Sequence, residues 1–427
     1  MRRRRAQGWH SEPMQQPPEQ EPVRRLLAYL GAAMVATGQP VSDIEHELAE
    51  VATRLGYPDA QIAGGPTGLH VTLASGAPST FESVKGPLRL DQAVDVRAIR
   101  AKLAYGVLSV EEGVDALLAL RSKPPLYPTW LANLGWVGAS VGIALILQPA
   151  WPNLAFTILG AVFVVALFRI GQRVSLIATL LPVLAAFVLA CAAFAATNAG
   201  LLEGPLRTLL APLAVLLPGA LIVTAMSELA AGAMVAGSSR LIFGGVQLLL
   251  FTLGILAASR LVPVSMDALS NVRVDHLGWW AGPLGLLLIT LGIAVLEGPP
   301  LRLLPWIALV LVLAFFAQSA GQQLSGAALG SFFGAVAASL GAYLVEAINP
   351  RLPRLVVFLP AFWLLVPGSL GLVSSTQLAV NPASGPATAV GVLTVMFAIA
   401  TGLLVGTAIA QSVRGTLRRW SRRRARD

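Results

Sequence analysis

The sequence has little charge and almost no cysteine. Charged residues make up 12% of its 427 residues, against roughly a quarter in soluble domains. Hydrophobic residues make up 56%, and the mean hydropathy is +0.72. Most of the chain therefore cannot face water, and a protein embedded largely in a membrane is predicted. Cys191, the one cysteine, excludes an internal disulfide, a cysteine-rich metal site and a cysteine redox pair.

Catalytic and nucleotide-binding motifs are missing as well. The sequence contains no P-loop, GxSxG or HExxH motif and no paired catalytic carboxylates. The four histidines, His10, His46, His70 and His276, lack metal-ligand spacing. The glycine-rich run 64–68 has no phosphate-binding lysine and is predicted to be a turn. We therefore expect no enzymatic activity, no metal or other cofactor, and no ATP-driven transport within the chain.

The N-terminal part of the sequence has a different character from the rest. Residues 1–21 are polar and proline-containing, which predicts a disordered tail. Residues 22–127 have the pattern of a small α/β domain that we place in the cytoplasm. Ser42 with Glu45, and Ser109 with Glu112, have the spacing of capping boxes that begin helices. Helices are predicted over 23–37, 44–55, 94–105 and 109–121, and short strands over 61–63, 69–73 and 80–84.

Ten apolar runs follow the linker 123–125, and each is near the length that crosses a bilayer. The predicted spans are 131–148, 154–170, 174–197, 205–226, 240–258, 279–296, 301–319, 325–347, 353–375 and 386–411. The fold class is therefore a polytopic α-helical membrane protein with about ten transmembrane helices.

Loop charges predict the orientation of these spans. With the N-terminal domain inside, the internal loops hold six arginines and the external loops three. A basic tail over 413–427 also lies inside after ten crossings, in agreement with the positive-inside rule. Both termini are therefore expected in the cytoplasm. The arginine-rich ends lack interleaved aromatic residues, so no nucleic-acid partner is expected. The internal arginines are Arg169, Arg173, Arg240, Arg302, Arg351 and Arg354, and the external ones are Arg207, Arg260 and Arg273.

Short matches recur across the membrane region at an offset of about 150 residues. Residues 217–221 (LPGAL) return as 366–370 (VPGSL), and residues 171–175 (GQRVS) return as 321–325 (GQQLS). Chance similarity between apolar segments is the alternative. The offset divides the chain into five-helix repeats over 128–277 and 278–412. Because five is odd, the second repeat is predicted to be inverted in the membrane, as in many secondary transporters.

Two proline-glycine pairs are the strongest candidates for a substrate pathway. Pro218-Gly219 and Pro367-Gly368 each lie inside an apolar run, where a break in the helix is tolerated if the freed backbone groups line a cavity. A simple kink is the alternative. Polar residues follow each pair and are included in the predicted pathway: Thr224, Ser227 and Glu228 after the first, and Thr376 and Gln377 after the second.

Two carboxylates are candidates for a proton carrier. Glu228 follows the first break, and Glu346 lies near the end of the eighth run. Carboxylates within or at the edge of a membrane often mark proton relays. The alternative is an interfacial glutamate that faces water, which we favour for Glu346.

The order of these features resembles the threonine/serine exporter family of bacterial membrane proteins. The resemblance covers residues 24 to about 411. It is carried in the soluble part by 26–31 (LLAYLG), 36–39 (ATGQ), 44–58, 66–69 (PTGL) and 108–113 (LSVEEG), and in the membrane by 217–232 and 366–368. As we read the family pattern, the acidic residue after the first Pro-Gly pair is usually Asp, whereas this chain has Glu228.

The resemblance implies export of threonine and serine from the cytoplasm, driven by the proton gradient, across the bacterial inner membrane. The implied partners are small amino acids, protons and the lipid bilayer, and a homo-oligomer is left open. Two alternatives remain: an exporter of another small metabolite, or a membrane sensor whose cytoplasmic domain binds a ligand.

Overall fold

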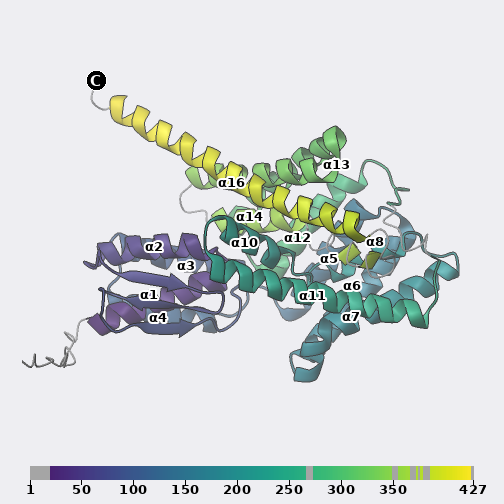
Figure 1. The fold of residues 1–427 in the computed structure, drawn as a ribbon, viewed down its shortest axis with the longest axis horizontal. Helices are drawn as coiled ribbons and strands as arrows, with labels where there is room; N and C mark the ends of the chain where they lie inside the picture. Colours follow the sequence, from purple (N-terminus) through teal and green to yellow (C-terminus); the bar gives the residue numbers. More distant parts are fainter. Residues whose placement is uncertain are drawn as a thin grey trace, which may run out of the picture.

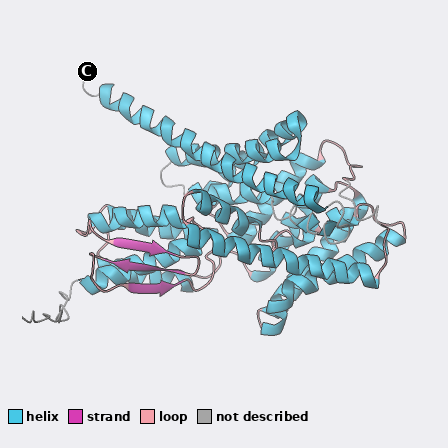
Figure 2. Cartoon of the chain, viewed as in Figure 1, coloured by secondary structure: helices cyan, strands magenta, loops and turns pink. Residues whose placement is uncertain are grey.

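The computed structural model describes residues 20–265, 273–348, 354–365, 372–373, 376–377 and 385–424. These residues are mostly helical, with one small sheet (Figure 2). Residues 20–122, here called the N-terminal unit, lie at one end of a larger bundle of helices (Figure 1). Its elements are α1 Gln20–Ala36, α2 Val41–Arg54, β1 Gln61–Gly64, β2 Gly68–Thr72, β3 Thr80–Ser83, α3 Leu90–Ala104 and α4 Val110–Ser122.

The N-terminal unit has two layers. Its strands form an antiparallel sheet in the order β1-β2-β3, with Ile62 opposite Val71 and His70 opposite Phe81. Leu69 and Val71 of β2 are fully buried in a core with the helices, whereas His70 between them is exposed. Because successive side chains of a strand point to opposite faces, this pattern places the helices on one face of the sheet.

The two predicted capping boxes have different outcomes. The Ser109 side chain accepts a hydrogen bond from the Glu112 amide at 3.2 Å, and the Glu112 carboxylate accepts one from the Ser109 amide at 2.9 Å. This box is confirmed at the start of α4. The expected box at Ser42 is wrong, because α2 begins at Val41 with Pro40 as its N-cap, and the Glu45 carboxylate accepts from the Gly64 amide at 2.8 Å. Glu45 thus connects α2 to β1.

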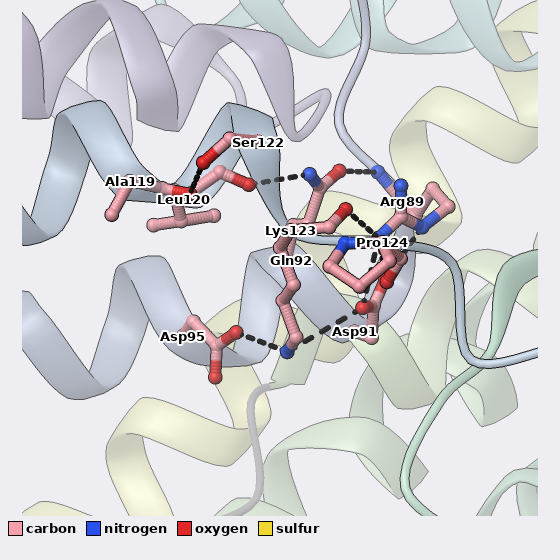
Figure 3. A network of polar contacts seen from close by, with 9 residues as sticks. All are labelled: Arg89, Asp91, Gln92, Asp95, Ala119, Leu120, Ser122, Lys123 and Pro124. Atoms are coloured by element: carbon pink, nitrogen blue, oxygen red, sulfur yellow. Dashed lines mark hydrogen bonds and ion pairs between the residues drawn. The ribbon is translucent and has the colours of Figure 1, made fainter.

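Polar contacts fix the end of the N-terminal unit to the linker (Figure 3). The side-chain amide of Gln92 donates to the Leu120 carbonyl at 2.8 Å, which ties α3 to α4. Lys123, the first residue of the linker, forms ion pairs with Asp91 and Asp95. Burial alone would lower the pKa of Lys123, but the bond to Asp95 and the charge of both aspartates raise it above its usual value. Lys123 is therefore charged, and the linker leaves the unit from a fixed position.

The remaining helices form the bundle. They are α5 Thr129–Leu147, α6 Trp151–Gly171, α7 Ser175–Asn198, α8 Pro205–Thr208, α9 Leu210–Leu213, α10 Gly219–Ala230, α11 Met234–Leu261, α12 Ala281–Glu297, the 3-10 helix η2 Leu301–Leu303, α13 Leu304–Ile348, α14 Arg354–Leu365 and α16 Gly385–Arg424. In the described part of the chain, six helical segments are long and apolar enough to cross a membrane: α5, α6, α7, α11, η2 with α13, and residues 393–410 of α16. The chain is thus a polytopic helical membrane protein, and the number of ten spans stays a prediction.

Several predicted spans differ from the observed helices. Residues 205–226, expected as one span, form α8, α9 and α10 with breaks between them. The predicted spans 301–319 and 325–347, by contrast, correspond to two helical segments within α13, which meet at a kink where the Ser325 and Gly326 backbone is non-helical. The residues predicted as a basic tail continue α16 as a helix to Arg424, and α1 begins at Gln20, inside the predicted disordered tail.

Glycines allow close helix contacts in the bundle. In α5 and α12, a Cβ atom added to Gly135 would lie 2.7 Å from the Gly292 carbonyl oxygen, and one added to Gly142 would lie 2.7 Å from the Gly285 oxygen. Backbones at this separation leave no room for a side chain, which is how small residues act between membrane helices. The order of the contacts makes α5 and α12 antiparallel.

Glycine also allows close contacts in two other pairs of helices. A Cβ atom on Gly254 of α11 would lie 2.5 Å from the Val183 oxygen of α7. One on Gly402 of α16 would lie 2.5 Å from the Phe332 oxygen of α13. The pairs α7–α11 and α13–α16 therefore pack through glycine in a similar way.

Candidate functional site

The helix break predicted at Pro218-Gly219 is present in the structure. Pro218 precedes α10 with φ −78° and ψ 31°, and the helix begins at Gly219. Proline has no amide hydrogen and a restricted φ, so it suits the start of a helix better than its interior. Thr224 and Ser227 are three residues apart in α10, and residues at this spacing share one helix face. The break thus positions a short helix with two hydroxyls on one side.

This face of α10 borders a cavity of about 150 Å³. The cavity lies between the N-terminal unit, which contributes the segment from Gly38 to Asp43, and four helices of the bundle, α10, α13, α14 and α16. Thr224 and Ser227 are both part of its lining. Apolar protein cavities of about 150 Å³ bind benzene, so this one has room for a small organic molecule.

One pair of opposite charges lines the cavity. The Arg354 guanidinium Nη2 of α14 donates to the Asp43 carboxylate Oδ2 of α2 at 2.7 Å. The Tyr343 ring of α13 lies under the same guanidinium, with 4.2 Å between the Arg354 Cζ and the ring centroid. The Asp43 side chain is 40% exposed and the Arg354 side chain is 27% exposed, so solvent reaches the pair.

Hydroxyl groups make up another part of the lining. Ser339 of α13 and Thr407 of α16 share a hydrogen bond of 3.1 Å between their side-chain oxygens. Among the residues that the structure describes, the Thr224 and Ser227 hydroxyls have no hydrogen-bond partner. A free hydroxyl in a cavity wall can both donate to and accept from a bound molecule.

Glu228 is buried beside this cavity rather than in its lining. Its side chain is 0% exposed and forms an ion pair with Arg240 of α11. Its Oε1 atom also accepts a hydrogen bond from the Val41 amide, the first of α2, at 2.9 Å. Its Oε2 atom has no hydrogen-bond partner in the described part of the chain. Glu228 therefore joins α10, α11 and the N-terminal unit, and its role as a proton carrier stays a prediction.

Another glutamate of the bundle also contacts the N-terminal unit. Glu346, near the end of α13, forms an ion pair with Arg97 of α3. The carboxylates of α10 and α13 thus share one arrangement, in which each receives a donor from the N-terminal unit.

The second group of predicted site residues is only partly described. Pro367 and Gly368 lie outside the described residues. Thr376 is buried, and its hydroxyl donates to the Leu372 carbonyl at 2.8 Å, one helical turn earlier. Gln377 is half-buried. The residues that bring the N-terminal unit to the cavity are not among the predicted site residues. That Pro367-Gly368 belongs to the same pathway as Pro218-Gly219 stays a prediction.

Sequence reasoning missed Asp43, Arg354, Tyr343, Ser339 and Thr407. Arg354 is predicted only as an internal loop charge, and no sequence pattern singles out Asp43. Their contact spans 311 residues of sequence, and no spacing pattern within a single chain indicates such a pair. In the described ranges, no three histidine, cysteine, aspartate or glutamate side chains gather as a metal site would require.

Comparisons with known proteins agree on one family. The family model ThrE, described as "Putative threonine/serine exporter", matches residues 25–262, more than half of the chain. This range runs from α1 through α11 and includes Asp43, Thr224, Ser227 and Glu228. No solved structure matches the chain.

A curated relative carries the same name. The "Probable threonine/serine exporter" of Mycobacterium tuberculosis (strain ATCC 25618 / H37Rv) is 23% identical over 213 residues. The alignment covers 48% of this chain and 40% of that protein, so the chain spans less than half the length of this relative. With the family model matched over more than half of its residues, the chain belongs to the threonine/serine exporter family.

Proposed function

We propose that the chain is a secondary exporter that moves threonine, serine or similar small amino acids out of the cytoplasm in exchange for protons. The observation that carries this proposal is the cavity between α10, α13, α14, α16 and the N-terminal unit. Its lining combines both signs of charge with hydroxyls that have no partner in the described part of the chain. It also lies beside a helix break, as substrate pathways in transporters do. Family membership and the apolar helices support the same conclusion.

Alternating access would follow from two inverted repeats, and the glycine contacts of α5 and α12 support them. Gly285 lies 150 residues after Gly135, and Gly292 lies 150 residues after Gly142. The contacts are crossed, since Gly135 meets Gly292 and Gly142 meets Gly285. A two-fold axis generates this pattern, because exchanging the two copies turns one contact into the other. The same offset relates the matching sequence segments.

The α7–α11 and α13–α16 contacts fit the same symmetry. Phe332 lies 149 residues after Val183, and Gly402 lies 148 residues after Gly254. Each pair would then be the counterpart of the other in the opposite repeat. Two symmetric halves can exchange inward-open and outward-open shapes around a fixed site.

The orientation that we propose places the N-terminal unit in the cytoplasm and the chain in the bacterial inner membrane. Arg240, Arg302 and Arg354, predicted to be internal, lie near or against the N-terminal unit. The C-terminal end of α16 extends toward the same end of the molecule (Figure 1). Basic residues on one side of the helices agree with the positive-inside rule.

The proposal also includes proton coupling. Glu228 is the first candidate for the proton carrier, and Glu346 is the second. Both are acidic groups with little exposure near the cavity end of the bundle. Protonation of Glu228 would weaken its ion pair with Arg240 and so loosen α10 from α11.

The test is flux in proteoliposomes that contain the purified full chain. An imposed pH gradient is expected to drive uphill movement of labelled threonine, and a protonophore is expected to abolish it. Flux equal to that of empty liposomes for every amino acid tested would contradict the proposal. Flux that ignores the pH gradient would remove proton coupling alone.

A further inference from the structure

We propose that Asp43 and Arg354 bind the two charged groups of an α-amino acid, the ammonium at Asp43 and the carboxylate at Arg354. This inference rests on the proposed function and adds the residues that recognise the substrate. It also gives the N-terminal unit a direct part in binding, because Asp43 belongs to α2.

The charges of the pair match those of an amino-acid zwitterion. An α-amino acid carries its ammonium and carboxylate on neighbouring carbon atoms, so the two charges are always close together. Asp43 and Arg354 present the complementary charges 2.7 Å apart on the wall of the cavity. A zwitterion that enters between them exchanges one ion pair for two, so no charge is left without a partner.

Arg354 is held in a position that suits a carboxylate. The Tyr343 ring packs against one face of the guanidinium at 4.2 Å, which restricts its rotation. The planar fork of arginine can donate two parallel hydrogen bonds to one carboxylate, which lysine cannot do. A fixed guanidinium with an exposed edge therefore selects carboxylates over single acceptors.

The hydroxyls of α10 give the same cavity a way to recognise the substrate side chain. The Thr224 and Ser227 hydroxyls, which have no partner among the described residues, can bond a ligand hydroxyl, while Ser339 and Thr407 already bond each other. A cavity of about 150 Å³ that must also hold the ammonium and carboxylate suits a small side chain better than a bulky one. Hydroxy amino acids thus satisfy both the charged pair and the free hydroxyls.

The experiment measures binding of labelled L-threonine to the purified full chain in lipid nanodiscs. Competitors are 1-amino-2-propanol, which lacks the carboxylate, and 3-hydroxybutyrate, which lacks the ammonium. We expect each to compete at least tenfold more weakly than unlabelled threonine. This arm uses the unaltered protein, so its outcome does not depend on the folding of a variant.

A second arm uses Asp43→Asn, Arg354→Gln and Arg354→Lys. The first two are expected to weaken threonine binding at least tenfold. Arg354→Lys keeps the charge without the fork, so an intermediate loss is expected. Arg97→Gln is the matched control, because it breaks another ion pair between the N-terminal unit and the bundle that does not line this cavity. It should bind threonine within twofold of the unaltered protein.

The outcomes separate this inference from the proposed function. If the unaltered protein transports threonine while Asp43→Asn and Arg354→Gln bind it normally, the inference is wrong and the exporter function stands. Equal competition by 1-amino-2-propanol and threonine would also overturn it. If the unaltered protein neither binds nor moves any amino acid, the proposed function itself fails.

Discussion

The ion pair between Glu228 and Arg240 offers a sharp test of how α10 is held. The Glu228 side chain is 0% exposed and that of Arg240 is 8% exposed, so both charges are removed from water. Glu228→Gln keeps an acceptor for the Val41 amide but leaves the Arg240 guanidinium buried without its counter-charge. Removing one partner of a buried pair costs about 3–5 kcal/mol, and we expect this loss in the free energy of unfolding.

The double variant distinguishes pairing from other effects. Glu228→Gln with Arg240→Gln leaves no buried charge, so its loss should be smaller than the sum of the single losses by up to about 3 kcal/mol. Unfolding in mixed micelles, followed by tryptophan fluorescence, measures all four proteins. This account of the pair would be refuted if each single variant lost less than about 1 kcal/mol of unfolding free energy, or if the loss in the double variant equalled the sum of the two single losses. Proton-driven flux in a folded double variant would also exclude Glu228 as the proton carrier.

Three further predictions concern stability and coupling. Gly142→Ala places a Cβ atom 2.7 Å from a backbone oxygen and should lower the unfolding free energy by about 1–3 kcal/mol, whereas Gly138→Ala on the same helix meets no atom within 4 Å and should not lower it. Ser109→Ala removes the capping box of α4 and should cost about 0.5–2 kcal/mol in the same denaturation assay. Glu346→Gln should retain pH-driven threonine flux in proteoliposomes, because its partner Arg97 gives it a role in joining the N-terminal unit to the bundle; loss of pH dependence would instead favour it as the carrier.

Local patterns predicted much of the fold. The apolar runs at 131–148, 154–170 and 174–197 correspond closely to α5, α6 and α7, because a run of apolar residues between polar breaks leaves few other structures in a bilayer. The Ser109–Glu112 box and the Pro218-Gly219 break were also predictable, since each depends on residues within one turn of helix. The boundaries failed where breaks interrupt an apolar run, as they do between α8, α9 and α10 in the predicted span 205–226.

Long-range contacts could not be predicted in the same way. The cavity depends on α2 meeting α14 and on two carboxylates of the bundle, Glu228 and Glu346, receiving donors from the N-terminal unit. Glu45 shows the same limit at shorter range. Its spacing from Ser42 suits a capping box, but its carboxylate bonds the Gly64 amide instead, because folding brings β1 alongside α2. Sequence spacing indicates which bonds are available and not which of them tertiary packing selects.

Threonine passage through the cavity is tested most directly by thiol labelling of Thr224→Cys. Cys191 is the only native cysteine, so Cys191→Ala gives a background without other thiols. In oriented membrane vesicles, a membrane-impermeant maleimide added on the cytoplasmic side is expected to label position 224, and threonine or serine is expected to slow the labelling. Labelling at one rate with and without either amino acid, in a variant that still transports threonine, would contradict the placement of the pathway.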